Sequence, residues 1–168
     1  MLKIIDNLKP FFEDCYRRIN VREYAKLMAI SPPTASKILE DFNKKGLLLR
    51  STYRNYILYY ANKESRDFID LSRIYWRRRL KELISFIEKD VANPTIILFG
   101  SLSKAEAKQD SDIDIAIFAH RKEINIRKFE DRMKRKIQVF CFRSIKDIKP
   151  KELENNIING YVLRGRIV

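Results

Sequence analysis

The 168-residue sequence predicts an α+β fold, with a helical first part and a second part in which strands and helices alternate. Two observations support this prediction. Before residue 46, apolar residues recur at helical spacing between typical helix-start and helix-stop residues. After Asn93-Pro94 the chain changes to short runs rich in β-branched residues, which are typical of strands.

The first part opens with two predicted helices. Apolar residues at helical spacing between Leu2 and Cys15 indicate an amphipathic helix that buries one face. Asn20 then begins a second helix, because its side chain can accept a hydrogen bond from a free backbone amide. Glu23, three residues later, completes a capping-box pattern. This second helix is expected to end near Ile30.

A third helix and a hairpin complete the first part. Ser31 followed by Pro32 is a strong helix start, because the serine oxygen accepts from a free amide and a proline at the first position loses no hydrogen bond. Two β-like runs follow, over residues 47–51 and 56–61, and the polar turn between them predicts a hairpin. Three helices and a hairpin make a winged helix, which is expected over residues 1–62.

A long connecting helix is expected over residues 63–91. No helix-breaking residue interrupts the chain from Ser65 to Asp90, and apolar residues recur there every three or four positions. Asn93-Pro94 ends this stretch, and the run Thr95–Phe99 begins the first strand of the second part. Residues 92–168 are expected to form a small mixed β-sheet with helices.

The composition narrows the functional classes. Lys and Arg number 35 against 22 Asp and Glu, and the formal charge of +13 favours a polyanion such as nucleic acid or nucleotide phosphates. Ribosomal, membrane-surface and solubilising roles stay open.

Cys15 and Cys141 lack the spacing of a disulfide framework or a zinc site, so two reduced thiols are expected. The sequence shows neither a signal peptide nor a membrane-spanning run, so a cytoplasmic protein is expected.

Residues able to bind phosphate and metal follow the first strand of the second part. At Gly100-Ser101 a glycine lets the backbone approach a phosphate, and the serine hydroxyl and following amides can donate to its oxygens. Asp112 and Asp114 lie two apart in a strand, so both carboxylates emerge on one face. Such a pair favours a divalent cation, and magnesium prefers oxygen ligands. The alternative for Gly100-Ser101 is an ordinary turn, and the alternative for the two aspartates is an edge strand on which both are solvated.

Together, Gly100-Ser101 and the run Ser111-Asp112-Ile113-Asp114 resemble the signature of the polymerase-β-type nucleotidyltransferase superfamily, and of its minimal nucleotidyltransferases in particular. The intervening stretch Ser103–Ala107 follows the superfamily pattern loosely, with lysine where arginine is usual. The resemblance covers Ile96–Phe118, and a weaker similarity extends to the C-terminus. It implies that the second part has a fold of nucleotidyltransferase type.

The resemblance also implies roles for individual residues. Asp112 and Asp114 would be catalytic and would hold one or two magnesium ions, which clamp the attacking and leaving oxygens of an in-line displacement. The reaction would transfer a nucleoside monophosphate, with ATP the expected donor, to a hydroxyl of a protein or nucleic-acid acceptor and release pyrophosphate. The nucleotide-binding residues would be Gly100, Ser101, Lys104 and Ser111.

A third carboxylate, which active members of the superfamily carry on a later strand, is missing from this sequence. The strand is expected at residues 136–142, and the position is occupied by Gln138. A glutamine can coordinate metal through its amide oxygen, which makes Gln138 a further candidate ligand, but it cannot act as a base. Two hypotheses follow. The chain is a nucleotidyltransferase, or it is a DNA-binding regulator or antitoxin with a catalytically weakened domain, for which a toxin partner rests on family analogy alone.

Residues 21–39 resemble the helix-turn-helix of winged-helix transcription regulators. Such motifs place the N-terminal residues of their second helix in the major groove, while the hairpin reaches the adjacent backbone. Protein contacts are the alternative use of this surface, and homodimers are common among winged helices. The expected DNA-contacting residues are Thr34, Ser36, Lys37, Arg50 and Arg54.

A strongly basic helix is expected over residues 121–136, between the strand that carries Asp112 and Asp114 and the strand that carries Gln138. Its apolar residues recur at helical spacing, so the basic side chains share the outer face. Such a face is either simply solvated or a phosphate-contacting surface for an acceptor. His120 has neither a cysteine nor a second histidine near it in the sequence, so no metal role is assigned to it.

Overall fold

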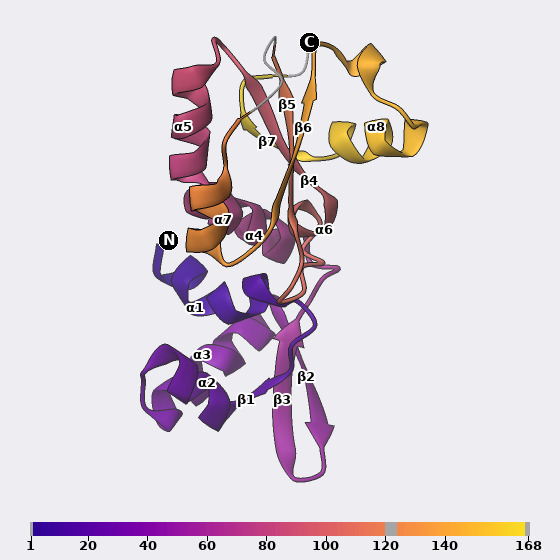
Figure 1. Ribbon diagram of the computed structural model, residues 1–168. Coiled ribbons are helices and arrows are strands. Elements are labelled where there is room, and N and C mark those ends of the chain that lie inside the picture. Colours follow the sequence, from indigo (N-terminus) through magenta and orange to yellow (C-terminus); the bar gives the residue numbers. More distant parts are fainter. Residues whose placement is uncertain (1, 120–123, 167–168) are drawn as a thin grey trace. The chain divides into compact units, whose positions relative to one another are not determined.

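The computed structural model describes residues 2–119 and 124–166, which form two compact units (Figure 1). The first unit extends to Tyr75 and also includes residues 105–109. The second comprises Trp76–Lys104 and the chain from Asp110 onward. This division falls inside helix α4 (Arg66–Arg79). The predicted domain boundaries near residues 62 and 91 lie where helices and strands end, whereas the two units are defined by their internal contacts. The predicted boundaries therefore stay a prediction.

The first unit contains the three predicted helices. The predicted caps at Asn20 and Ser31 form, but the capping box does not, because the Glu23 side chain is paired with Arg17 at 2.7 Å. The Asn20 side chain accepts a hydrogen bond from Glu23 N at 2.9 Å, and Ser31 Oγ accepts one from Thr34 N at 3.4 Å. Each cap satisfies an amide that would otherwise lack a helical partner. The helices are α1 (Leu2–Glu13), α2 (Val21–Met28) and α3 (Pro32–Lys44).

A three-stranded sheet completes the first unit. Strands β2 (Leu48–Tyr53) and β3 (Tyr56–Ala61) form the predicted hairpin, with Arg54 in the left-handed region at the turn, φ +52°. The short strand β1 (Ile19–Asn20) pairs with β3, which gives the order β1-β3-β2. The three helices and the hairpin are therefore confirmed. Strand β1 was not predicted, because two residues are too few to show a strand period.

The connecting helix is divided into two, which corrects the prediction of one uninterrupted helix. Helix α4 ends at Arg79, and α5 (Lys81–Asp90) begins after Leu80, whose ψ of 0° departs from helical geometry. The sequence has no breaker at this point. The break is a local distortion, because the hydrogen bonds from Leu80 N to Trp76 O and from Ile84 N to Leu80 O, both 2.9 Å, continue through it.

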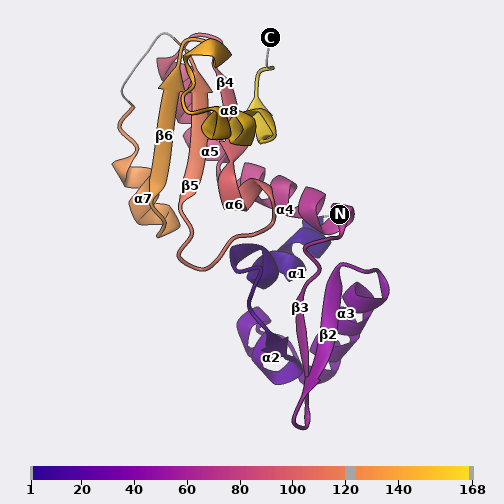
Figure 2. The ribbon, with the colours of Figure 1, turned by 90° about the vertical axis from the view of Figure 1, so that its right-hand side faces the viewer.

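The second unit contains the predicted mixed sheet, in the order β6-β5-β4-β7. Strands β5 and β6 are parallel, and the other neighbours are antiparallel. Helices α5 and α7 cover one face of this sheet and α8 covers the other (Figures 1 and 2). The strands are β4 (Thr95–Phe99), β5 (Ile113–Phe118), β6 (Ile137–Phe142) and β7 (Tyr161–Arg164).

Three α-helices and one short 3-10 helix connect the strands. The basic helix expected over residues 121–136 is shorter than predicted, since α7 spans only Arg127–Met133. His120, Arg121 and Lys122 lie outside the described residues, so the predictions made for them stay predictions. The other helices are α6 (Gly100–Ser103), η1 (Ile145–Asp147) and α8 (Lys151–Ile158).

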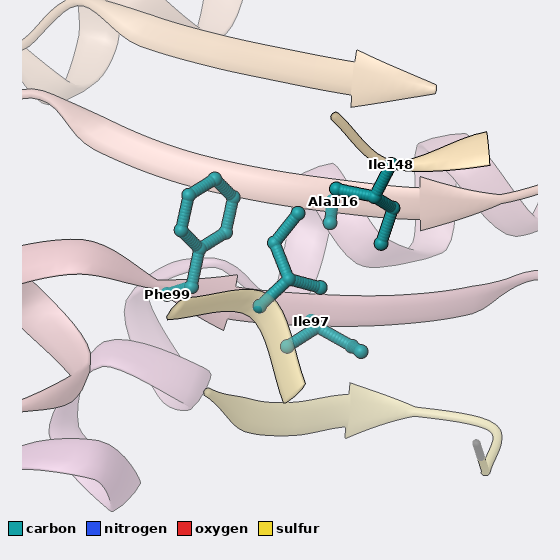
Figure 3. Packing of buried hydrophobic residues seen from close by; sticks show 5 residues of the cluster. Ile97, Phe99, Ala116 and Ile148 are labelled. Carbon is teal, nitrogen blue, oxygen red and sulfur yellow. The ribbon is translucent and has the colours of Figure 1, made fainter. Parts of the chain in front are cut away.

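Alternation along the strands separates the two sides of the second unit. Ile113, Ile115 and Ile117 are completely buried, as the sequence predicted. On the other side, Ile97, Phe99 and Ala116 pack with Ile148 and Ile157 in a cluster near α8 (Figure 3). Asp114 precedes Ala116 by two positions and therefore lies on this second side. Among the described residues, no helix is long and apolar enough to cross a membrane.

Candidate functional site

The end of β4 brings the backbone of Gly100 directly against the carboxylate of Asp114. Phe99 pairs with Asp114 across the antiparallel strands β4 and β5. Gly100 has a φ of +69°, a conformation that side-chain-bearing residues rarely adopt. A Cβ atom at this position would overlap Asp114 Oδ2 and lie 3.2 Å from its Cγ. A side chain here would strain the backbone and displace the Asp114 carboxylate, so the glycine leaves backbone rather than side chain beside it.

Asp112 and Asp114 form a half-buried carboxylate pair at the start of β5. Burial raises the pKa of the Asp114 carboxyl above its ordinary range, and the negative charge of Asp112 raises it further. Both effects disfavour a second negative charge at this point. A bound cation would reverse them, so the electrostatics of the pair suit a positively charged ligand.

Gln138 lies where the sequence placed it, beside the carboxylate pair. Strands β5 and β6 run parallel with Asp114 opposite Gln138, and Gln138 Nε2 donates a hydrogen bond to Asp112 Oδ2 at 2.6 Å. The glutamine thus stabilises the charge of Asp112 as a donor. The nearby acid Glu130 is occupied elsewhere, because its Oε1 accepts a hydrogen bond from Ile137 N at 2.9 Å at the start of β6.

These residues fit a magnesium ion, although the ligand set is small. Among the residues the structure describes, no group of three or more His, Cys, Asp or Glu side chains could hold a metal. The hard oxygens therefore come from two carboxylates, Asp112 and Asp114, with the amide oxygen of Gln138 as the neutral addition. Magnesium commonly binds proteins through one or two carboxylates and takes its other ligands from water and substrate phosphates.

A positioning contact behind Asp112 was not found from the sequence. Arg135 is buried, and its Nη1 donates to the carbonyl oxygen of Ser111 at 2.6 Å. Its guanidinium carbon also lies 5.3 Å from the centre of the Trp76 ring. Arg135 therefore fixes the backbone that precedes Asp112. No local pattern signals this contact, since the three residues are widely separated in the sequence and Arg135 sits within a basic run.

The two remaining predicted phosphate ligands lie on and just after the short helix α6. Ser101 is half-buried in its first turn, where its carbonyl accepts a hydrogen bond from Lys104 N at 3.3 Å. The exposed ammonium of Lys104 donates to Asn156 Oδ1 on α8 at 3.0 Å. Their predicted contacts with a triphosphate stay predictions.

The predicted DNA-contacting residues lie on α3 and the hairpin of the first unit. Thr34 and Lys37 are exposed, and Ser36 is half-buried. The guanidinium of Arg50 is held by Glu40 on α3, with 2.9 Å between Nη1 and Oε1. Arg54 is exposed at the hairpin turn. Lys37 and Arg54 are therefore exposed cations for which the structure describes no ion pair, and Thr34 and Ser36 are uncharged. Arg50 is already paired with Glu40.

Glu40 has two partners that hold α3 against the hairpin. It accepts a hydrogen bond from Tyr59 Oη at 2.8 Å, besides its ion pair with Arg50. The Tyr59 bond and the Arg50 charge lower the pKa of Glu40 below its ordinary range. Burial, followed by the bond to Glu40, raises the pKa of Tyr59 to about 12. No local pattern signals this link, because Glu40 and Tyr59 belong to different elements.

One comparison with known proteins identifies the family of the second unit. The family model described as "Polymerase beta, Nucleotidyltransferase" matches residues 81–166, which include all four strands of the sheet and the carboxylate pair. One similar solved structure is described as "Crystal structure of the toxin-antitoxin with AMP-PNP", with 22% sequence identity and a TM-score of 0.42. That similarity covers 51% of this chain and 73% of the other. The comparison with curated proteins found no match.

The close approach of Gly100 to Asp114 predicts a specific sensitivity to substitution. Gly100→Ala adds a clash with the carboxylate to the strain of a positive φ, whereas Gly46→Ala is a matched control with the same φ of +69° and no atom within 4 Å of the added Cβ. We expect Gly46→Ala to lower the free energy of unfolding by about 1–2 kcal/mol. Gly100→Ala should cost roughly 1–3 kcal/mol more and should weaken binding of ATP with magnesium.

Urea unfolding and calorimetric titration of ATP with magnesium measure both effects. Equal stability losses in the two variants, together with unchanged nucleotide binding by Gly100→Ala, would show that the close approach of Gly100 to Asp114 contributes neither to stability nor to nucleotide binding.

The raised pKa of Asp114 predicts how stability depends on pH. The folded protein holds the Asp114 proton more tightly than the unfolded chain, so ionisation of Asp114 destabilises the fold as pH rises through the raised pKa. Without magnesium, Asp114→Asn should therefore have a higher unfolding temperature than wild type at about pH 7. This gain should shrink towards about pH 4, near the ordinary pKa of aspartate.

Circular dichroism thermal scans provide the measurement. Asp131→Asn, on the exposed side of α7, is the matched control and should change the transition little at either pH. An Asp114→Asn variant that is less stable than wild type at neutral pH contradicts the assignment.

Proposed function

The chain belongs to the polymerase β nucleotidyltransferase family, and we propose that its second unit binds a nucleoside triphosphate with magnesium and transfers the nucleoside monophosphate to an acceptor hydroxyl. The observation that supports this most is the juxtaposition at the end of β4. The Gly100 backbone, which can approach a phosphate, lies against a carboxylate pair suited to a cation. The proposed donor is ATP, and the proposed acceptor is a protein or a nucleic acid.

Each residue of the site has a proposed part in this reaction. The backbone at Gly100-Ser101 and the Ser101 hydroxyl would hold triphosphate oxygens, with Lys104 and Ser111 contributing from either side of the intervening segment. Asp112 and Asp114 would hold the metal, with Gln138 as a neutral neighbour. Magnesium would supply charge stabilisation for the oxygens of the displaced pyrophosphate. Arg135 would act as a positioning residue by fixing the Ser111 backbone.

The transfer itself is a displacement at the α-phosphorus. A bond forms between the acceptor hydroxyl oxygen and this phosphorus as the bond to the oxygen bridging the α- and β-phosphates breaks, so pyrophosphate leaves with the electron pair. The hydroxyl must also lose its proton. Gln138 cannot accept it, because an amide is not a base near neutral pH. We therefore propose that the proton passes to a carboxylate of the pair or to water, and that turnover is slow.

A second candidate function follows from the hydrogen bond between Gln138 and Asp112. An amide that donates to Asp112 at 2.6 Å occupies one lone pair that a metal could otherwise use. This contact favours a site that binds nucleotide without catalysing transfer. In that case the chain is a DNA-binding regulator or an antitoxin whose second unit senses nucleotide. No side chain among the described residues identifies a toxin partner.

Label transfer separates the two candidates. We expect the protein, incubated with magnesium, labelled nucleoside triphosphates and candidate acceptors, to transfer label to an acceptor. Asp112→Asn combined with Asp114→Asn should reduce this transfer by about 100-fold or more, because it removes both anionic ligands. Gln138→Asp should raise the rate, since it restores a carboxylate. If nucleotide binds with magnesium and neither wild type nor Gln138→Asp moves label to any acceptor, the enzyme proposal fails and the regulator stands.

We further propose that the first unit is a winged helix that binds DNA through α3 and the hairpin. Three observations support this. The helices and hairpin occur in the expected order, Thr34 and Lys37 are exposed on the first turns of α3, and Arg54 is exposed at the hairpin turn. Because Arg50 is paired with Glu40, the proposal gives Arg54 and Lys37 the main part in contacting phosphates.

Retention on immobilised duplex DNA at low salt tests this part. Lys37→Glu with Arg54→Glu should weaken retention by about tenfold or more, because two phosphate contacts are lost and two repulsive charges are added. Lys3→Glu with Lys9→Glu makes the same charge change on the exposed side of α1 and is the control. Equal losses in the two double variants, or no retention of wild type, would remove DNA binding from the proposal.

A further inference from the structure

Two adjoining cavities lie between α5 and α7 in the second unit. The first has a volume of about 570 Å³ and the second about 380 Å³, and they share Lys81, Glu82, Phe129 and Arg132 in their linings. Phe86 of α5 and Phe129 of α7 both line the first cavity, and the centres of their rings lie 5.3 Å apart. Together the cavities form one continuous hollow, which we call the α5–α7 groove.

Basic side chains are concentrated in the α5–α7 groove. Of the described residues that line it, six are basic and one is acidic. The second unit as a whole has twenty basic and twelve acidic residues, so the ratio of basic to acidic residues is much higher in the groove than in the unit. Clustering of one sign of charge in a hollow strengthens the local field and attracts a polyanion. The basic residues are Arg78, Arg79, Lys81, Lys89, Lys128 and Arg132.

The only acid among these lining residues does little to neutralise the groove. Glu82 forms an ion pair with Arg132, and both side chains are more than three-fifths exposed, at 63% and 66%. Solvent screens such a pair strongly, and it contributes little to stability. Arg132 can therefore exchange this partner for a phosphate, while Lys81 and Lys89 are exposed on α5 beside it.

Aromatic rings accompany the charges. Phe86 is half-buried in the wall of the first cavity, and Lys128 Nζ lies 4.4 Å from the centre of its ring. Proteins that bind single strands combine a basic groove for the backbone with aromatic side chains on which bases stack. An acidic protein segment would use the charges without needing a ring. Pockets of about 300–1,000 Å³ hold drug-sized ligands, so both cavities have room for a small part of a strand.

We propose that the α5–α7 groove binds single-stranded nucleic acid. The phosphates lie along Lys81, Lys89, Lys128 and Arg132, and a base stacks on Phe86. The groove lies between α5 and α7, which cover the opposite face of the sheet from α8 (Figure 1). Asp114 precedes the clustered residue Ala116 by two positions and so lies on the α8 side, which means that a strand in the groove does not compete with nucleotide. The proposal adds a second ligand site to the unit and does not depend on transfer taking place.

Fluorescence anisotropy with a labelled single strand of about 12 nucleotides tests the proposal. Every protein in the comparison carries Lys37→Glu and Arg54→Glu, so that the first unit contributes little. Adding Lys81→Glu and Lys128→Glu should weaken binding by at least tenfold. It should also lower the slope of log affinity against log salt by about 1.4, the value for two lost contacts with a single strand.

The matched control is Lys146→Glu with Lys149→Glu, which makes the same charge change at exposed positions near α8. It should retain binding to within about twofold and most of the salt dependence. Equal loss in the two variants would show that net charge alone attracts the strand. No loss in the groove variant would place the strand elsewhere. Either result overturns the proposal.

Two further measurements test the base contact and the independence of the site. Phe86→Leu keeps an apolar side chain but removes the ring, so it should weaken binding of the oligonucleotide about fivefold or more and leave inorganic polyphosphate binding unchanged. Stronger binding of polyglutamate than of the oligonucleotide would overturn the nucleic-acid assignment in favour of an acidic protein. Titration of ATP with magnesium into the groove variants should match the background protein, which separates failure of this site from failure of the nucleotide site.

Discussion

The second unit depends on one close contact, between the backbone of Gly100 and the carboxylate of Asp114. Antiparallel pairing of β4 with β5 places Phe99 opposite Asp114, and the chain must turn away immediately afterwards. A positive φ and the absence of a Cβ atom allow this turn. The parallel pairing of β5 with β6 then sets Gln138 opposite Asp114. Sheet register therefore brings together three segments that are distant in the sequence.

This arrangement is electrostatically unfavourable without a ligand. Asp114 is partly removed from water and faces the charge of Asp112, and both effects raise its pKa. The hydrogen bond from Gln138 and the anchoring of the Ser111 backbone by Arg135 offset part of this cost. Polar groups held in a costly arrangement by the surrounding fold are typical of functional sites. The pair therefore supports a cation-binding role better than a structural one.

Local chemistry was predictable from the sequence, whereas contacts between distant segments were not. The caps at Asn20 and Ser31 and the strand Thr95–Phe99 follow from residue types at short spacing, whereas the place of Gln138 was implied by the resemblance to the nucleotidyltransferase superfamily. The distortion at Leu80 has no helix-breaking residue to signal it, and the contact of Arg135 with Ser111 depends on tertiary packing. A two-residue strand such as β1 has no period to detect. Helix propensity and strand alternation describe neighbours in the chain, so they cannot indicate such contacts.

The most direct test of the central claim is the position of metal and triphosphate in a crystal of the protein grown with manganese and a non-hydrolysable ATP analogue. Manganese scatters anomalously and prefers the same oxygen ligands as magnesium. The account predicts an anomalous peak at the carboxylates of Asp112 and Asp114, with phosphate oxygens accepting hydrogen bonds from the backbone at Gly100-Ser101. A triphosphate bound elsewhere, or an analogue bound at Gly100 without metal at the aspartates, would contradict it.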